Sequence, residues 1–346
     1  MAKDKRKYVT FGELMLRLSP PGTELLMQTP SLVATFGGAE ANVAVSLANY
    51  GEEVRYVTAL PENPLAEAAI RELRGFGIDT TYIRRSGERV GIYYAEAGAS
   101  MRPSKVVYDR AHSSISEVSG GDFDWREIFR DAHWFHTTGI TPAVAKGTAD
   151  VTLEAIQAAK EMGLTVSCDL NYRKKLWKWG KQPAEVMSEI ARYVDVLIAN
   201  EEDCQKCLGI ELDVDVSSGK LDTAKYEKLA GIVMEHFPNV SRLAVSLRES
   251  VSADWNNWSI VMATKNDFFV SKKYEIRDIV DRIGGGDAFG SGLIWGLNNL
   301  EGDQAAVEFA AAASALKHTV YGDYNRVALA DVRNLAGGDA SGRVQR

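Results

Sequence analysis

Gly284-Gly285-Gly286-Asp287-Ala288-Phe289-Gly290-Ser291-Gly292 is followed by an apolar run with helical periodicity. Three glycines lead into the expected helix, and their missing Cβ atoms let the backbone approach a ligand closely. The first N–H groups of a helix have no internal acceptor and the helix dipole adds positive potential, so this stretch predicts a phosphate site. Asp287 would then lie beside the anion. A carboxylate is also a good N-cap, but capping alone does not require three preceding glycines, so we favour a catalytic role.

A phosphate cradle beside a carboxylate suits the transfer of a phosphoryl group to a hydroxyl. Backbone dipoles would stabilise the transferred group, and the carboxylate would accept the hydroxyl proton. The sequence has no G-x-x-x-x-G-K-[ST] motif, no H-R-D with D-F-G, and no G-x-G-x-x-G after the first expected strand. These absences disfavour P-loop enzymes, protein kinases and dinucleotide-binding proteins.

The composition of the 346-residue chain is that of an ordinary globular protein, with 45% hydrophobic and 25% charged residues. A net charge of -7 without a long basic stretch argues against nucleic acid as the main partner. No apolar run is long enough for a membrane span, and no signal-like run follows the basic N-terminus. The odd count of three cysteines suits a reducing compartment, so we expect a cytoplasmic protein. Cys204 and Cys207 have the spacing of half a zinc site but lack a second pair, so no metal site is predicted there.

Short β-rich runs alternate with helical patterns along most of the chain. The expected strands are 8–13, 54–60, 133–139, 164–170, 194–199 and 242–247. The expected helices are 39–50, 65–76, 147–162, 223–236, 287–298 and 304–319. Such alternation requires crossover connections, so we predict an α/β fold with a mostly parallel sheet covered by helices on both faces.

Two segments break this alternation. Residues 14–34 contain several prolines and lack helical periodicity, and residues 89–108 have the pattern of a β-hairpin. They could pair as a small separate sheet, or they could be surface loops and an edge hairpin. The sequence favours neither alternative.

A second glycine cluster, Phe36-Gly37-Gly38-Ala39-Glu40-Ala41-Asn42, opens the first expected helix. Asn42 brings a donor and an acceptor to the helix start, as recognition of a polyol requires. The alternative is a Gly-Gly turn followed by a solvated asparagine. The cluster is a weak signal alone and a useful one beside the stretch at 284–292.

Together, Gly37-Gly38-x-x-x-Asn42 and Gly284–Gly292 resemble the two signatures of the PfkB carbohydrate kinase family, and the resemblance covers nearly the whole chain. Shorter matches resemble the 2-keto-3-deoxygluconate kinases of that family. These matches are 11–15, 37–44, 102–103, 107–110, 139–142, 169–173, 317–319 and 322–323. The resemblance implies a ribokinase-like α/β/α sandwich made of 1–13, 36–88 and 113–346, with a small β-sheet lid made of 14–35 and 89–112. It also implies ATP and Mg²⁺ as cofactors and a homo-oligomer formed through the lid.

The resemblance also implies a role for individual residues. Asp287 would be the general base, and Gly284, Gly285 and Gly286 would form the anion hole. The substrate-binding residues would be Gly37, Gly38, Asn42, Tyr93, Arg102, Tyr108, Arg110, Ile140, Arg173 and Asp323. The ATP-binding residues would be Asn171, Arg173, Asn200, Ser246, Arg248, Gly284 and Gly286. Asn200-Glu201-Glu202-Asp203 resembles an Asn-x-x-Glu motif that acts on phosphate and Mg²⁺ through water, so no protein ligand of the metal is assigned.

The arginines help to choose among substrates. A carboxylate that moves from water into a covered pocket needs a cationic partner, and Arg102, Arg110 and Arg173 could supply it. We therefore expect phosphorylation of the terminal hydroxyl of a sugar acid, 2-keto-3-deoxygluconate. The alternatives are a fructokinase or another neutral-sugar kinase, and a non-catalytic sugar-sensing protein of the same fold. Asp287 and its glycines argue against the last of these.

Two stretches depart from the family pattern. Many relatives are activated by K⁺ beside the anion-hole loop, and Arg282 stands where the family commonly has threonine. We expect the guanidinium to take the place of that cation, with a solvent-facing Arg282 as the alternative. The segment Ser246-Leu247-Arg248-Glu249-Ser250 lacks the glycines of the usual nucleotide turn, so Arg248 would replace a backbone N–H.

Overall fold

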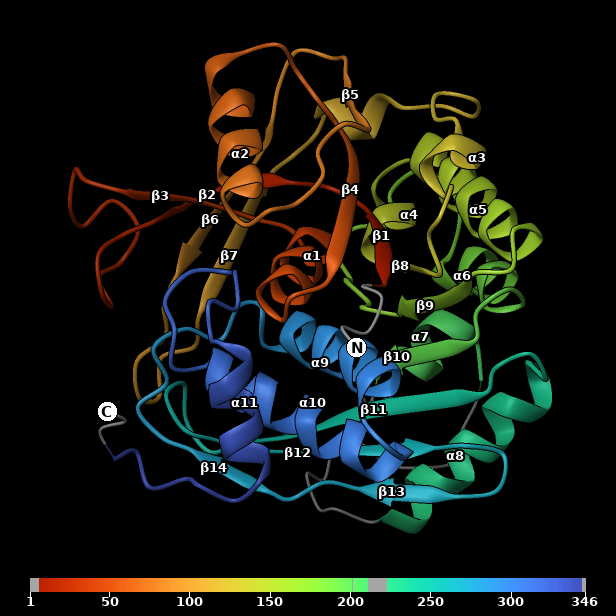
Figure 1. The fold of residues 1–346 in the computed structure, drawn as a ribbon. Coiled ribbons are helices and arrows are strands. Elements are labelled where there is room, and N and C mark those ends of the chain that lie inside the picture. Colours follow the sequence, from red (N-terminus) through yellow and green to blue (C-terminus); the bar gives the residue numbers. More distant parts are fainter. Residues whose placement is uncertain (1–5, 201, 211–222, 344–346) are drawn as a thin grey trace.

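The computed structural model describes residues 6–200, 202–210 and 223–343. Its central feature is a ten-stranded sheet in the order β13-β12-β11-β10-β9-β8-β1-β4-β5, with β14 paired to β12 (Figure 1). The strands are β1 (Lys7–Phe11), β4 (Glu53–Leu60), β5 (Ile83–Arg85), β8 (Trp134–Thr138), β9 (Thr165–Asp169), β10 (Val196–Ala199), β11 (Arg242–Ser250), β12 (Asn256–Ala263), β13 (Phe268–Val270) and β14 (Tyr274–Ile276). Pairing is parallel from β5 to β11 and antiparallel beyond β11. The predicted mostly parallel sheet is confirmed.

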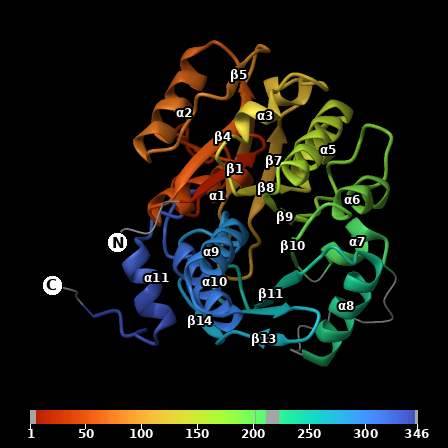
Figure 2. The same cartoon turned by 45° about the vertical axis from the view of Figure 1, so that its right-hand side comes forward.

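Helices cover both faces of this sheet (Figure 2). The helices on one face are α1 (Ala39–Asn49), α2 (Pro64–Gly75), α9 (Gly285–Asn299), α10 (Asp303–Lys317) and α11 (Leu329–Ala336). Those on the other face are α3 (Trp125–Ile128), α5 (Lys146–Glu161), α6 (Pro183–Ala191), α7 (Asp203–Leu208) and α8 (Thr223–His236). Successive strand residues alternate between the two cores, since Leu197 packs in one and Ile198 in the other. The two apolar faces explain why the strands are nearly continuous apolar runs.

A separate four-stranded sheet projects from the body in the order β3-β2-β6-β7 (Figure 1). Its strands are β2 (Met15–Ser19), β3 (Val33–Gly37), β6 (Gly91–Glu96) and β7 (Lys105–Asp109). We call these four strands the small sheet. The two segments that break the alternation in the sequence thus pair with each other. The loop between β6 and β7 reaches the turn between β11 and β12, where Ala253 N donates to Ser100 O at 2.8 Å.

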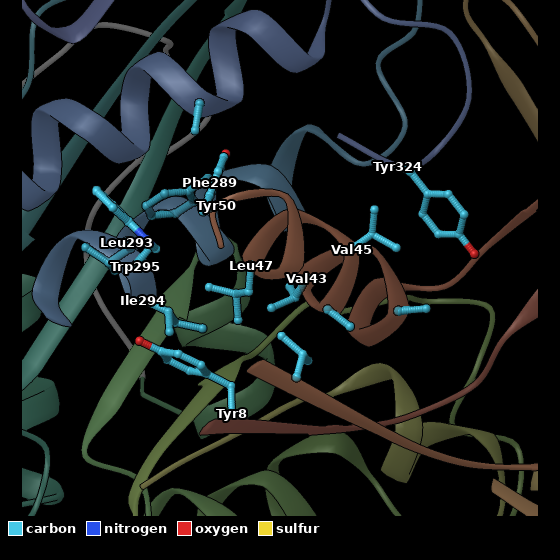
Figure 3. Packing of buried hydrophobic residues seen from close by; sticks show 14 of the residues in the cluster. Tyr8, Val43, Val45, Leu47, Tyr50, Phe289, Leu293, Ile294, Trp295 and Tyr324 are labelled. Carbon is cyan, nitrogen blue, oxygen red and sulfur yellow. The ribbon is translucent and has the colours of Figure 1, made fainter. Parts of the chain in front are cut away.

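Helix α9, which begins with the glycine-rich stretch, is packed very closely against its neighbours. A Cβ atom on Gly296 would lie 2.8 Å from Ala306 Cα, so α9 and α10 can approach this closely only because glycine faces alanine. On its other side α9 packs against α1, where Leu47, Leu293 and Ile294 interlock (Figure 3). The two helices that begin with glycine pairs or triplets are therefore held side by side.

The expected elements begin within two residues of the observed ones, but several elements were not expected. These are β5, β12, β13, β14, α3, α4 (Ile140–Val144), α6, α7, α11 and the short 3₁₀ helix Ser114–Glu117. All of them are shorter than ten residues, so periodicity gives little signal for them. Among the described residues, no helix combines the length and apolar character needed to cross a bilayer.

Candidate active site

A cavity of about 630 Å³ lies at the carboxyl ends of the parallel strands, between the central and small sheets. Ligands of open α/β sheets bind at this edge because the strand ends and helix starts meet there. The sequence-predicted residues that line it are Gly38, Asn42, Tyr93, Tyr108, Ile140, Asn171, Arg173, Asn200, Ser246, Arg248, Gly284, Gly285, Gly286, Asp287 and Asp323. Gly37, Arg102 and Arg110 are not among the lining residues.

The start of α9 forms the floor of the cavity. Gly284 has φ 84°, and a Cβ atom on it would lie 2.1 Å from Asp323 O, so this position requires glycine. A Cβ on Gly285 would lie 2.7 Å from His318 Cε1. A Cβ on Gly286 would meet nothing within 4 Å, so the backbone there is open. The exposed first turn of α9 has the geometry of an anion cradle.

Asp287 is held in this first turn by a residue of the other glycine-led helix. Asn42 Nδ2 donates to Asp287 Oδ2 at 2.6 Å, and Asn42 Oδ1 accepts from Gly38 N at 3.3 Å. The residue at the N-cap is Gly284, and no side chain caps α9, so the capping alternative for Asp287 is wrong. Burial raises the pKa of Asp287 to about 6 and Asp323 adds to the rise, while Asn42 and Arg173 oppose it.

The small sheet supplies one wall of the cavity. The rings of Tyr93 and Tyr108 lie side by side with centroids 6.1 Å apart. Tyr93 OH lies 2.6 Å from each carboxylate oxygen of Asp323, to which it donates. A Cβ on Gly37 would lie 2.1 Å from Asp323 Oδ2. Gly37 thus makes room for Asp323 rather than lining the cavity itself.

The two arginines outside the cavity lining already have acidic partners. Arg102 forms an ion pair with Glu96 at 3.0 Å. The buried Arg110 forms an ion pair with Glu13 and lies over the ring of Tyr108, with its Cζ 5.5 Å from the centroid. The sequence did not indicate either carboxylate partner.

Arg173 is the one of the three arginines predicted for the substrate that lines the cavity. It is exposed, and its guanidinium donates to the neighbouring Tyr172 O at 2.9 Å. Its positive charge lowers the pKa of Asp287, against the larger effect of burial. Arg173 is therefore near enough to the reacting end of the cavity to bind an anionic group.

The opposite end of the cavity is formed by β10, β11 and β12. Ser246 and Arg248 line this end, together with residues that were not among the predicted site residues: Ile198, Trp258, Phe289 and His318. The rings of Trp258 and His318 have centroids 5.5 Å apart. Trp258 lies on an antiparallel strand that the alternation of strands and helices did not predict, so no local pattern indicated this wall.

Arg282 does not occupy the anion-hole loop. Its guanidinium is bound by Asn256 Oδ1 and lies 3.4 Å from Ser250 Oγ, on the β11–β12 hairpin. Neither expectation for Arg282, as an internal cation of the loop or as a solvent-facing side chain, describes this position. Burial and the nearby Arg248 lower the pKa of Arg282.

In the segment after β10, side-chain oxygens mainly accept hydrogen bonds from backbone N–H groups. Asp203 accepts from Tyr172 N and Asn200 N, both at 3.0 Å, and Asn200 Oδ1 accepts from Glu202 N at 2.9 Å. Glu201 lies outside the described residues. Within 6–200, 202–210 and 223–343, no group of three or more His, Cys, Asp or Glu residues could hold a metal ion.

A glycine-led helix start, a carboxylate and an adjoining polar cavity on this fold define a phosphotransferase acting on a small hydroxyl compound. The family model described as "pfkB family carbohydrate kinase" matches residues 5–328, and the chain belongs to that family. The predicted family and the ribokinase-like fold class are thereby confirmed.

Two curated relatives and one solved structure are similar over nearly their full lengths. The 2-dehydro-3-deoxygalactonokinase of Haloferax volcanii is 34% identical over 96% of this chain and 97% of its own. The 2-dehydro-3-deoxygluconokinase of Bacillus subtilis is 24% identical over 91% and 90%. The crystal structure of 2-dehydro-3-deoxygluconokinase from Thermotoga maritima is 48% identical, with a TM-score of 0.91 over 98% of this chain and 100% of the other.

Proposed function

We propose that this chain transfers the γ-phosphoryl group of ATP to the terminal hydroxyl of a sugar acid, with Asp287 as the general base. The observation that carries the proposal is the position of Asp287 in the first turn of α9, beside the open backbone of Gly286 and fixed by Asn42. Sugar-kinase chemistry needs a carboxylate and an anion cradle at one place.

In the proposed reaction the hydroxyl oxygen forms a bond to the γ-phosphorus while the bond from that phosphorus to the leaving oxygen of ADP breaks. Asp287 takes the hydroxyl proton, and the amides of Gly284, Gly285 and Gly286 stabilise the charge on the transferred group. A carboxyl group with a pKa near 6 is ionised at neutral pH and basic enough to accept a proton.

The substrate that we propose is 2-keto-3-deoxygluconate, the compound also called 2-dehydro-3-deoxygluconate. Two of the similar proteins are named for it, and the third is named for the galactonate form. Tyr93, Tyr108 and Ile140 would contact the sugar, and Arg173 provides a cation in the cavity for an anionic group. We propose that Arg110 also binds the carboxylate of the sugar acid. Val106 and Tyr108 line the cavity, and Arg110, two residues further on, lies on the same side of the chain.

ATP fits the other end of the cavity, where apolar and aromatic side chains adjoin Ser246, Arg248 and the backbone of Gly286. Asn171, Arg173 and Asn200 would contact its phosphates. Bound there, ATP supplies the phosphoryl group, with Mg²⁺ on its phosphate oxygens. The proposed Mg²⁺ ligands are phosphate and water, since no acidic cluster among the described residues could hold the ion.

The small sheet would act as a lid over the sugar. We propose that 14–35 and 89–112 form this lid on a body made of 1–13, 36–88 and 113–346. Exposed apolar side chains on the small sheet and its loops, such as Met27, Val33 and Val107, support association of lids in a homo-oligomer. We propose that the enzyme works in the cytoplasm.

Release of ADP across a panel of substrates tests the proposal. The panel holds 2-keto-3-deoxygluconate, its galactonate epimer, fructose and ribose, each with wild-type protein and with Asp287→Asn. We expect the highest kcat/KM for a 2-keto-3-deoxy sugar acid and a loss of turnover in the variant. Equal turnover of fructose would favour a neutral-sugar kinase, and no turnover of any sugar would favour the sugar-sensing alternative.

A further inference from the structure

Lys317, in the last turn of α10, is a charged side chain that has no contact with the cavity. Its side chain is 0% exposed, and its ammonium donates to Val320 O at 3.1 Å. Its Cε lies 3.2 Å from the position that a Cβ on Gly284 would occupy. Lysine is almost never fully buried unless it is paired, so this position needs an explanation.

Two buried carboxylates that share an arginine lie in the same region, since Asp323 O and Lys317 Cε both lie beside Gly284. Arg17 binds Asp281 Oδ2 at 2.7 Å and Asp323 Oδ1 at 2.9 Å. Asp281 also accepts from Ile283 N at 3.0 Å and from Gly322 N at 3.1 Å. Both carboxylates act as acceptors in these bonds. Arg17 and Lys317 are therefore two basic side chains buried in the same region as two acidic ones, where opposite charges can compensate each other.

This charge network is joined directly to the anion cradle. Asp281 holds the backbone of Ile283, the residue before Gly284, and the carbonyl of Asp323 lies against Gly284. One turn earlier on α10, Ser314 Oγ donates to Gly285 O at 2.7 Å. The end of α10 therefore supports the cradle from behind, and the Lys317 ammonium lies on this side of the loop.

We propose that Lys317 is the fixed internal cation of the Gly284–Gly286 loop. Its ammonium raises the positive potential at the amides that receive the transferred phosphoryl group, and its side chain supports the loop by packing behind Gly284. The chain then has no need for an exchangeable monovalent cation at this loop. This inference rests on the proposed function, and it makes Lys317 a positioning residue rather than a catalytic one.

Two contrasting substitutions test the inference. Lys317→Ala removes the charge and leaves space, whereas Lys317→Met removes the charge and fills the space. We expect kcat to fall roughly 10- to 100-fold in both, somewhat less than the loss of a direct oxyanion donor. KM for the sugar should change little, because Lys317 does not line the cavity.

Chemical rescue separates an electrostatic role from a structural one. Ammonium or methylammonium ions, at constant ionic strength, should restore much of the rate of Lys317→Ala. They should not help Lys317→Met, and the bulky tetramethylammonium ion should help neither variant. Wild-type turnover in Lys317→Met, or equal rescue by tetramethylammonium, would overturn the inference.

Two further measurements extend the test: the first needs no variant, and the second does not depend on the identity of the sugar. Wild-type turnover in KCl and in tetramethylammonium chloride should be the same, and a several-fold activation by K⁺ would contradict the inference. The Kd for ATP alone, measured by calorimetry, should be weaker in Lys317→Ala and should recover with ammonium. An unchanged Kd would also count against it. If no sugar is phosphorylated by wild-type protein, the proposed function fails while the ATP measurement still decides the role of Lys317.

Discussion

Asn42 and Asp287 are 245 residues apart in the sequence, and Asn42 Nδ2 lies 2.6 Å from Asp287 Oδ2. This hydrogen bond joins the starts of α1 and α9, the two helices that follow glycine clusters. It occupies one carboxylate oxygen of Asp287, so Oδ1 is the atom that we expect to meet the substrate hydroxyl. Two motifs at opposite ends of the chain therefore form one site.

Asp287→Asn should lower kcat by roughly 10²- to 10⁴-fold, because a positioned base contributes about that much to proton transfer. Its side-chain oxygen can still accept from Asn42, so folding should be retained. Turnover and circular dichroism check both points. Asp303→Asn is a matched control, since Asp303 lies in the first turn of α10 and pairs with Arg242. Wild-type turnover in Asp287→Asn would exclude the general-base role.

The pH dependence of kcat/KM should have an acid limb near pH 6. Burial raises the pKa of Asp287 to about 6, and only the ionised form can accept the proton, so activity falls as the pH drops through this value. Glu40, whose pKa burial raises to about 7, lies behind the site and binds Thr138 and Thr141. A pH profile of Glu40→Gln should keep the limb near pH 6. If the acid limb disappears in Glu40→Gln, the group that titrates is Glu40 and not Asp287.

The raised pKa of Asp287 also affects stability, which should fall with rising pH in the range where activity rises. The carboxyl pKa is 3.8 in an unfolded chain and about 6 in the folded protein, so the native state binds more protons between these values. The free energy of unfolding therefore falls as the pH rises from about 4 to 6. Asp287→Asn should raise Tm at pH 7 and have little effect at pH 4. A lower Tm for the variant at pH 7 would contradict this assignment.

Arg110→Leu should raise KM for a sugar acid roughly 10- to 100-fold more than KM for a neutral sugar, since a charge-assisted hydrogen bond contributes about 1.5–3 kcal/mol. It also leaves the buried Glu13 without its partner, so Tm should fall. The double variant Glu13→Gln/Arg110→Leu separates the two effects. Arg89→Leu is the control, since Arg89 pairs with Asp109 at the surface. Equal increases in KM for both sugars would mean that Arg110 does not bind the carboxylate of the sugar acid.

Two glycine-to-alanine substitutions should change stability in opposite directions. Gly296→Ala should lower the free energy of unfolding by about 1–3 kcal/mol, because the added Cβ would lie 2.8 Å from Ala306 Cα. Gly231→Ala in α8 should raise it by up to about 1 kcal/mol, because its Cβ would meet nothing within 4 Å and alanine favours the helix. Urea unfolding measures both. Equal effects would mean that the contact between α9 and α10 is not tight.

The sequence was sufficient for elements whose pattern is local. Alternating strands and helices identified the parallel half of the central sheet, and the glycine clusters identified the starts of α1 and α9. The sequence did not predict which residues far apart in the chain pair with each other. Nothing near Arg110 indicates Glu13, 97 residues away.

The burial of Lys317 could not be predicted from the sequence either. In the sequence it is a basic residue in the last turn of a helix, where a lysine commonly interacts with the helix dipole at the surface. Only tertiary packing reveals that it is fully buried behind Gly284. Arg282 replaces the threonine of the family pattern beside the loop, which predicts a cation there, but its side chain binds Asn256 instead.

The contact between Ser100 and Ala253 has a kinetic consequence. The loop that contains Ser100 belongs to the small sheet, which we propose as the lid over the sugar, and the turn that contains Ala253 belongs to the hairpin that carries Arg248 at the proposed nucleotide end. A swing of the small sheet away from the body has to break this hydrogen bond and free the hairpin. Departure of the phosphorylated sugar and departure of ADP are then steps of one movement, and solvent viscosity should slow them together.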